Sequence, residues 1–165
     1  MQKPQTGDVP EGKESVWDYP RPPRLEPCHH RIRVECDGIT LVDSVNALRM
    51  LETSHPPVYY IPSTDIQLQF LRQSERVSWC EWKGQAGYVH LQTPERLIEN
   101  VAWFYPNPSP SYANLRQHYA FYAPKVDACF VGDEQVQPQP GDFYGGWITS
   151  HIVGPFKGGP GTRGW

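Results

Sequence analysis

Hydrophobic and polar residues alternate over several short stretches of the chain, and this period of two predicts β-strands. The stretches are rich in β-branched and aromatic residues, and Gly, Pro, Asn and Asp separate them. Asp37-Gly38 is a strong hairpin-turn signal between the first two stretches. The predicted strands are residues 32–35, 39–42, 58–61, 77–80, 86–91, 100–105, 119–122 and 128–131.

Segment 45–52 fits two patterns. Val45, Leu48 and Leu51 are spaced by three, as on a helix, whereas Leu48 and Met50 alternate, as on a strand. Because the segment is short and lies between predicted strands, we expect a strand.

Helices are expected to be few and short, because the chain contains 14 Gly and 18 Pro. Ser109 is a suitable N-cap and Pro110 suits the first helical position, so one short helix is predicted to carry residues 112–117. A further helical turn is expected within residues 63–71.

Both ends of the chain read as extended arms. Residues 1–27 are polar and rich in proline, which removes donors from a sheet interior. Trp17 and Tyr19 indicate that residues 15–27 lie on the domain, since large aromatics are uncommon in solvated tails. Residues 138–165 are rich in Gly and Pro and carry the spaced aromatics Phe143, Tyr144, Trp147 and Phe156.

The fold class that follows is mostly β. We expect residues 1–14 to form a flexible tail and residues 15–165 to form one domain, which is the size of a typical single core. Its core is predicted to be compact, with two small antiparallel sheets, one short helix, and extended N- and C-terminal arms.

Composition excludes several classes of function. Charged residues make up 20% of the chain and the net charge is −3, so neither nucleic acid nor an anionic membrane is an expected partner. No apolar run approaches the roughly 20 residues of a membrane-spanning helix, and the first residues lack the apolar core of a secretory signal. A cytosolic location is therefore expected.

The four cysteines are scattered along the chain without a C-x-x-C pair. In a chain without a secretory signal, such cysteines are expected to be reduced thiols. Cys28-His29-His30 has the wrong spacing for a zinc site, because adjacent side chains point in different directions. We expect no metal and no cofactor.

The run Trp79-Cys80-Glu81-Trp82-Lys83-Gly84 combines several reactive groups at a predicted bend. Cys80 is a candidate nucleophile, with His118 or His90 as its base, although a thiol between two indoles also fits a core position. Lys83 could hold an anionic ligand together with the Gly84 amide, or it could be a solvated turn lysine.

Aromatic residues make up 13% of the chain, and several lie on predicted strands. Because neighbouring side chains alternate, Trp103 and Tyr105 share one face of their strand and Phe104 takes the other. One face is expected to be core, and the other could line a pocket with a polar rim. The candidate ligand-binding residues are Tyr60, Trp82, Lys83, Gly84, Trp103, Tyr105 and Tyr119.

Seven segments, in chain order, resemble one family, domain of unknown function 427. They are residues 15–22, 59–62, 79–88, 100–106, 119–122, 143–147 and 154–158. The resemblance implies a "β-tent" fold, a pair of roughly orthogonal antiparallel sheets. Many β-tent proteins hold a zinc on two C-x-x-C knuckles, and this sequence has neither.

The same family is sometimes labelled nucleotidyltransferase. Nucleotidyl transfer usually needs divalent cations held by closely spaced carboxylates, and the chain has no Asp-x-Asp or Asp-x-Glu pair. Residues 157–162 have the composition of a phosphate-binding loop but not its residue order. The residues therefore do not support that activity.

The leading hypothesis is a domain that binds a small molecule, nucleoside-like or otherwise planar, near Trp82, Lys83, Trp103 and Tyr105. One alternative is a cysteine- or lysine-dependent enzyme at the same place that uses Cys80 and His118. A second alternative is an interaction module whose arms make a homodimer.

Overall fold

The computed structural model describes residues 9–141 and 144–165. Residues 1–8 of the predicted tail, and Phe143 of the predicted C-terminal arm, lie outside the described residues. No helix in the described part of the chain is long and apolar enough to cross a membrane.

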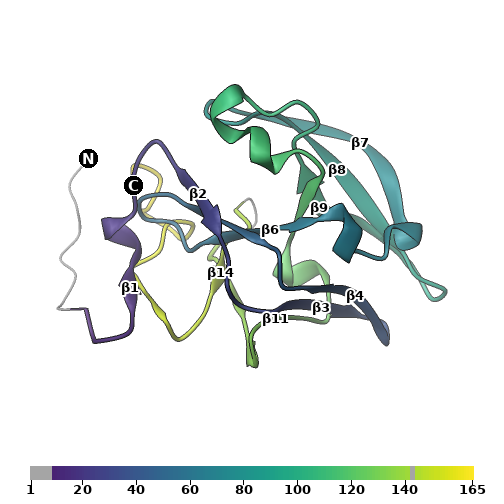
Figure 1. Cartoon of the computed structure of the whole chain (residues 1–165), viewed down its shortest axis with the longest axis horizontal. Helices are drawn as coiled ribbons and strands as arrows, with labels where there is room; N and C mark the ends of the chain where they lie inside the picture. Colours follow the sequence, from purple (N-terminus) through teal and green to yellow (C-terminus); the bar gives the residue numbers. More distant parts are fainter. Residues whose placement is uncertain (1–8, 142–143) are drawn as a thin grey trace.

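Two antiparallel sheets form the body of the protein (Figure 1). The larger has seven strands in the order β2-β5-β6-β10-β9-β8-β7, and the smaller has four in the order β12-β11-β3-β4. The larger sheet consists of β2 (Arg24–Pro27), β5 (Leu48–Leu51), β6 (Val58–Pro62), β7 (Leu71–Cys80), β8 (Gly84–Gln92), β9 (Leu97–Phe104) and β10 (His118–Phe121). The smaller consists of β3 (Ile32–Cys36), β4 (Ile39–Ser44), β11 (Ala128–Val131) and β12 (Glu134–Gln135).

The mostly β prediction is confirmed, and each predicted strand overlaps an observed one. Segment 45–52 contains the strand β5, as expected. The Pro-rich N-terminal arm adds β2 to the larger of the two antiparallel sheets, by pairing with β5. β2 is an edge strand, the position in a sheet where proline is tolerated.

The predicted helix is a 3₁₀ helix, η4 (Pro110–Leu115), with Pro110 in its first turn. It ends before the predicted residue 117, and Ser109 does not cap it through its side chain. The Ser109 hydroxyl donates instead to the carbonyl of Trp82. The helical turn expected within residues 63–71 appears as two 3₁₀ turns, Ser63–Asp65 and Leu68–Phe70.

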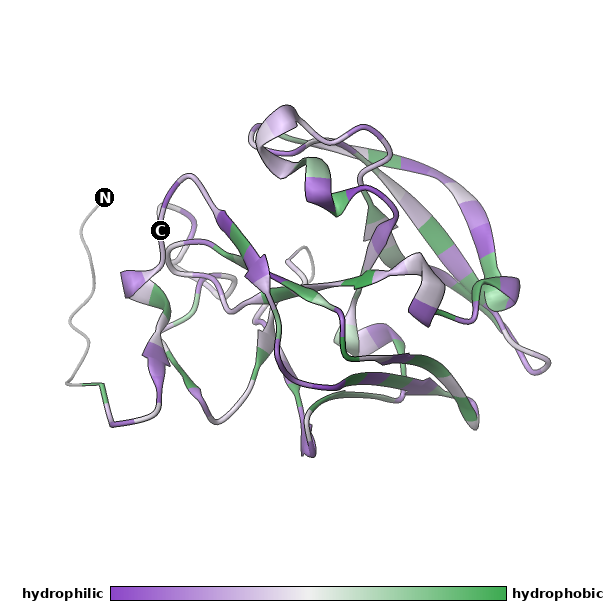
Figure 2. Ribbon diagram, in the orientation of Figure 1, coloured by the Kyte–Doolittle hydropathy of each residue, from purple (hydrophilic) through white to green (hydrophobic). Residues whose placement is uncertain are grey.

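Hydrophobic and hydrophilic residues are interspersed along the strands (Figure 2). The buried apolar side chains of the seven-stranded sheet fall into two clusters, one on each face. One face packs with the four-stranded sheet in a core that includes Tyr59, Ile61 and Phe121. The other face carries a second cluster built around Tyr60 and Trp103, which η4 covers. This separation follows from strand alternation, since Tyr59 and Tyr60 are neighbours that point to opposite faces.

The remaining strands belong to the arms. They are β1 (Glu14–Ser15), β13 (Gln137–Pro138), β14 (Trp147–Ile148) and β15 (Ile152–Val153). β1 pairs in parallel with β15, so the two arms lie side by side (Figure 1). Trp147 anchors the C-terminal arm, because it is 1% exposed, stacks on Tyr59 with ring centroids 5.2 Å apart, and donates its indole N–H to the Phe121 carbonyl at 3.0 Å.

The C-terminal arm folds back on itself where Gly158 meets Pro140. A Cβ on Gly158 would lie 1.7 Å from the Pro140 carbonyl oxygen, and its φ of +132° is one that other residues rarely adopt. The same fold-back is bridged by Gln139, whose amide donates to the Lys157 carbonyl at 2.8 Å.

We predict that Gly158→Ala lowers the free energy of unfolding by about 2 kcal/mol, through this clash and the strained φ. For a chain of this size the melting temperature should fall by roughly 4–8 °C. Gly164→Ala is the matched control, because a Cβ there meets no atom within 4 Å, and it should change stability by less than about 0.5 kcal/mol. Equal melting temperatures for the two variants would contradict the close packing of this arm.

Candidate functional site

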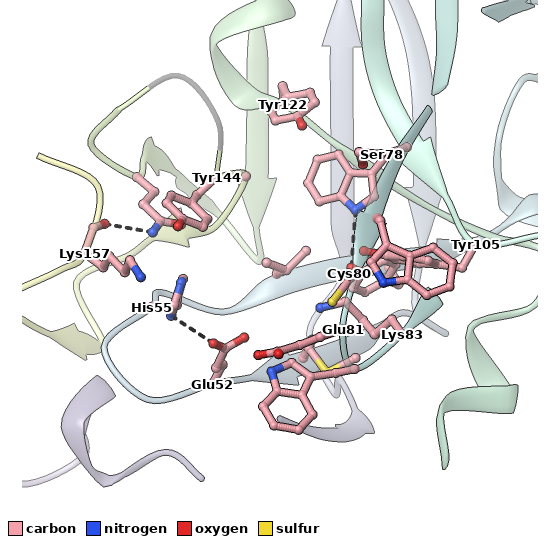
Figure 3. A pocket seen from close by; sticks show the side chains of 18 of the residues that line it. Glu52, His55, Ser78, Cys80, Glu81, Lys83, Tyr105, Tyr122, Tyr144 and Lys157 are labelled. Atoms are coloured by element: carbon pink, nitrogen blue, oxygen red, sulfur yellow. Dashed lines mark hydrogen bonds and ion pairs between the residues drawn. The ribbon is translucent and has the colours of Figure 1, made fainter. Parts of the chain in front are cut away.

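A cavity of about 250 Å³ opens on the face of the seven-stranded sheet that carries Tyr60 and Trp103. Its walls come from β5, β6, β7, β8 and β9, from the turn between β7 and β8, and from the C-terminal arm (Figure 3). The lining combines aromatic rings with charged and amide side chains.

Trp103 is the central aromatic wall. It lies on β9 opposite Tyr88 of β8 and Ala120 of β10, and it is 7% exposed. Its indole N–H donates to the Tyr60 hydroxyl at 3.3 Å, which fixes the orientation of the ring. The Tyr122 ring packs against it with centroids 4.5 Å apart. The wall is therefore rigid and has a hydroxyl at its edge.

Gly145 of the C-terminal arm lies directly against this wall. A Cβ at this position would be 2.1 Å from the Trp103 ring, so only glycine lets the arm approach so closely. Both Gly145 and its neighbour Tyr144 line the cavity. The arm therefore helps to shape the site as well as completing the fold.

The turn that joins β7 to β8, residues 81–83, is held by the segment that precedes η4. The Ser109 amide donates to the Lys83 carbonyl at 3.0 Å, and the Ser109 hydroxyl donates to the Trp82 carbonyl. Gly84 ends the turn with a φ of +105°, a conformation that glycine adopts without strain. These contacts direct the Lys83 side chain into the cavity.

Lys83 is 9% exposed, and its ammonium lies 5.8 Å from the centre of the Tyr105 ring. None of the ion pairs found among residues 9–141 and 144–165 includes it. Burial lowers the pKa of Lys83, but Tyr60, Cys80 and Glu52 favour its charged form, and the net direction of the pKa is upward. The cavity therefore contains a buried cation that forms no ion pair with a carboxylate of the described residues.

Cys80 is half-buried and lines the cavity beside Lys83. The other three cysteines, Cys28, Cys36 and Cys129, are buried away from it. Burial raises the pKa of each of these three thiols, in the case of Cys129 to about 12. They are therefore poor nucleophiles, since the thiolate is the reactive form.

Four polar side chains of the lining were not anticipated from the sequence. They are Glu52, His55, Gln139 and Lys157. His55 is 9% exposed, and its Nδ1 lies 2.9 Å from the Thr53 carbonyl oxygen and 3.7 Å from the Glu52 carboxylate. In the sequence, His55 precedes two prolines and reads as a strand break, so nothing marked it as a site residue.

Most of the residues proposed from sequence meet at this cavity. Trp103 and Tyr105 share a face as predicted, while Phe104 packs on the opposite side against Tyr119, with centroids 5.1 Å apart. Alternation thus takes Tyr119 away from the cavity. The proposed residues that line it are Tyr60, Cys80, Trp82, Lys83, Trp103 and Tyr105.

Gly84 and His118 do not line the cavity. Gly84 shapes the turn through its backbone, as described above. His118 begins β10, and its Nδ1 lies 2.9 Å from the Arg116 carbonyl oxygen. The structure therefore does not bring His118 to Cys80 as a base, and the histidine of the cavity is His55.

One group of residues outside the cavity has the composition of a metal site. The ligand atoms of Cys36, Asp37 and Asp127 lie within 4.8 Å of one another. Arg96 forms ion pairs with both carboxylates, at 2.9 Å to Asp37 and 3.6 Å to Asp127. Since a cation already balances these carboxylates, the group is explained as an ion-pair network.

The fold and site define a mostly β protein with an aromatic cavity that contains a buried lysine. The family model NTP_transf_9, described as a domain of unknown function (DUF427), matches residues 24–132. The chain belongs to this family. No curated protein matches the chain at a significant level. The matched region contains Cys80, Lys83 and His55, whereas Gly145 and Lys157 come from the C-terminal arm beyond it.

We predict that iodoacetamide modifies the native protein at Cys80, because the other thiols are buried and have raised pKa values. Mass spectrometry after digestion should place the first modification at Cys80, and Cys80→Ser should remove it. Modification of Cys129 as early as that of Cys80 would contradict the burial of Cys129 in the core. The unfolded chain, in which all four thiols react, is the control.

Proposed function

We propose that the cavity binds a small planar molecule that carries an anionic group. The observation that carries this proposal is the buried ammonium of Lys83, which has no carboxylate partner among the described residues and lies at the end of an aromatic cavity. Proteins bury charges where they are paired, so a group absent from the chain itself is the natural partner for this cation.

The aromatic walls support a planar ligand. Trp103 and Tyr105 line the same cavity, and the Trp103 ring is held by its hydrogen bond to Tyr60. A flat ring can stack or pack edge-on against such walls, with an additional gain of about 0.5–1.5 kcal/mol per aromatic pair beyond burial of area. The preorganised wall avoids the entropy loss of ordering side chains on binding.

The size of the cavity limits the enclosed part of the ligand. An apolar cavity of roughly 150 Å³ holds benzene. By proportion, about 250 Å³ accommodates on the order of ten non-hydrogen atoms. An aromatic acid or a nucleobase fits this volume, while the sugar and phosphates of a nucleotide would extend outside it.

A second candidate function is a cysteine-dependent reaction at the same site. It is favoured by the position of the Cys80 thiol, which lines the cavity beside the Lys83 ammonium. This function predicts that iodoacetamide reacts with Cys80 much faster than with free cysteine at pH 7. If Cys80 reacts only as fast as free cysteine while the protein still binds its ligand, the cysteine-dependent reaction is excluded and only the binding function remains.

We predict that aromatic acids stabilise the protein against heat and that their neutral amides do not. Suitable matched pairs are benzoate and benzamide, nicotinate and nicotinamide, and indole-3-carboxylate and its carboxamide. At a concentration of 100 times Kd, a bound acid adds about 2.7 kcal/mol, which is roughly 5–10 °C in melting temperature for this chain length.

Lys83→Met should abolish the preference for acid over amide, because it keeps the length of the side chain and removes the charge. Trp103→Leu should weaken binding of the acid, because it removes the aromatic wall. Lys13→Met, an exposed lysine outside the cavity, is the control and should bind as the unmodified protein does. Amides that bind as tightly as their acids would overturn the role of Lys83.

A further inference from the structure

His55 faces the cavity from the loop between β5 and β6, whereas Lys83 enters from the turn between β7 and β8 (Figure 3). The two residues therefore approach one cavity from different elements. His55 is also one of its most buried polar groups, at 9% exposed. The aromatic walls and Lys83 do not explain why a histidine is held there.

The contacts of His55 determine which ring nitrogen carries the proton. Nδ1 lies 2.9 Å from the Thr53 carbonyl oxygen, which can only accept, so Nδ1 is the N–H donor. The Glu52 carboxylate, 3.7 Å away, favours the same arrangement. In neutral imidazole, the second nitrogen, Nε2, is then an acceptor.

Nε2 is turned away from Glu52 (Figure 3). Among residues 9–141 and 144–165, no hydrogen bond to Nε2 is found, and the contacts of the ring are made through Nδ1 and through an edge-on packing with Tyr144, at 5.1 Å between centroids. No fully buried side-chain nitrogen or oxygen among the described residues lacks a partner, so an unpaired Nε2 is open to the cavity. Such an acceptor is a position where a ligand donor is recognised, because a ligand that covered it without a donor would leave it unsatisfied.

Burial is the main cause that favours the neutral form of the His55 ring. Burial lowers its pKa most, Glu52 and the Thr53 carbonyl oppose this, and the cations Lys157 and Arg21 lower it further, so that the net direction is downward. The Ser54 hydroxyl, 3.5 Å from Nδ1, and the Tyr144 ring add no charge. At neutral pH the imidazole is therefore present as an acceptor.

We propose that His55 determines the specificity of the cavity by accepting a hydrogen bond from the ligand, and that the preferred ligand is an aromatic acid that also bears a hydroxyl or ring N–H group. This inference rests on the binding function proposed above. In the complex, the acid group contacts Lys83, the ring lies against Trp103, and the hydroxyl donates to His55 Nε2.

Matched pairs of hydroxy and methoxy acids test the inference. The probes are 3-hydroxybenzoate, 4-hydroxybenzoate and 6-hydroxy-2-naphthoate, each compared with its methyl ether by isothermal titration calorimetry at pH 7.5. The ethers keep the ring and the carboxylate but lose the donor. For the isomer that spans the cavity, the hydroxy acid should bind at least tenfold more tightly than its ether.

His55→Asn should reduce that ratio to near one, because asparagine can still donate to the Thr53 carbonyl but has no atom at the position of Nε2. His55→Gln, whose amide reaches further, should restore part of the ratio. His118→Asn is the matched control, because His118 makes the same Nδ1 contact with a backbone carbonyl two residues earlier and does not line the cavity. It should leave the ratio unchanged.

The ratio should also depend on pH. As the pH falls through the lowered pKa of His55, Nε2 gains a proton and can no longer accept, so the ratio should fall toward one. Attraction between the charged imidazolium and the carboxylate acts on both members of a pair and cancels in the ratio. The protonation of His55 can be followed by NMR over the same pH range, and a ratio that stays constant while His55 gains its proton would overturn the inference.

The outcomes separate the two proposals. If every hydroxy acid binds no better than its ether, His55 is not a specificity determinant, although the binding function stands. If no acid binds at all, the binding function fails. Nitrogen-15 NMR of the unliganded protein then tests His55 by itself: a neutral Nδ1–H tautomer is expected, and an Nε2–H tautomer would overturn the inference.

Discussion

The structure depends on one constraint: the seven-stranded sheet carries apolar side chains on both of its faces, and both must be covered. The four-stranded sheet covers one face, around Tyr59 and Phe121. The other face is covered by smaller pieces, namely η4, the 81–83 turn and the C-terminal arm. Several short segments cover a flat sheet less completely than a second sheet does, and the cavity is the space left between them.

The same constraint explains why the arms belong to the site. Trp147 fixes the C-terminal arm in the core, and this places Gly145 against Trp103. Tyr112 of η4 donates its hydroxyl to the Pro23 carbonyl at 2.7 Å, which joins the N-terminal arm to the apolar cluster around Tyr60 and Trp103. The C-terminal arm lines the cavity directly, whereas the N-terminal arm supports the face on which the cavity opens.

Much of the site could be predicted because strand alternation and turn residues are local signals. The pairing of Trp103 with Tyr105 follows from a period of two, and Lys83-Gly84 marks a bend that the structure places at the cavity. His55 and Lys157 could not be found in this way. They reach the cavity through long-range packing of a loop and an arm, and no local pattern encodes such contacts. His118 was favoured as a base because sequence shows which histidines exist, but not which of them face Cys80.

The roles of the site residues are proposals that rest on one physical argument about Lys83. Lys83 is 9% exposed and makes no ion pair with a carboxylate among residues 9–141 and 144–165, so its ammonium has lost most of its hydration without a close counter-charge. Proteins can keep such a group where function requires it, even if another side chain would be as stable there. The aromatic walls, the cavity size and the acceptor of His55 then restrict what the cation can bind.

The most direct test is the free energy of unfolding of Lys83→Met, measured by chemical denaturation without any ligand. If the ammonium is held for a ligand, its replacement by an apolar side chain of similar length should leave the protein equally stable or more stable. A loss of more than about 1 kcal/mol would show that the ammonium stabilises the folded chain itself, and this would contradict the account.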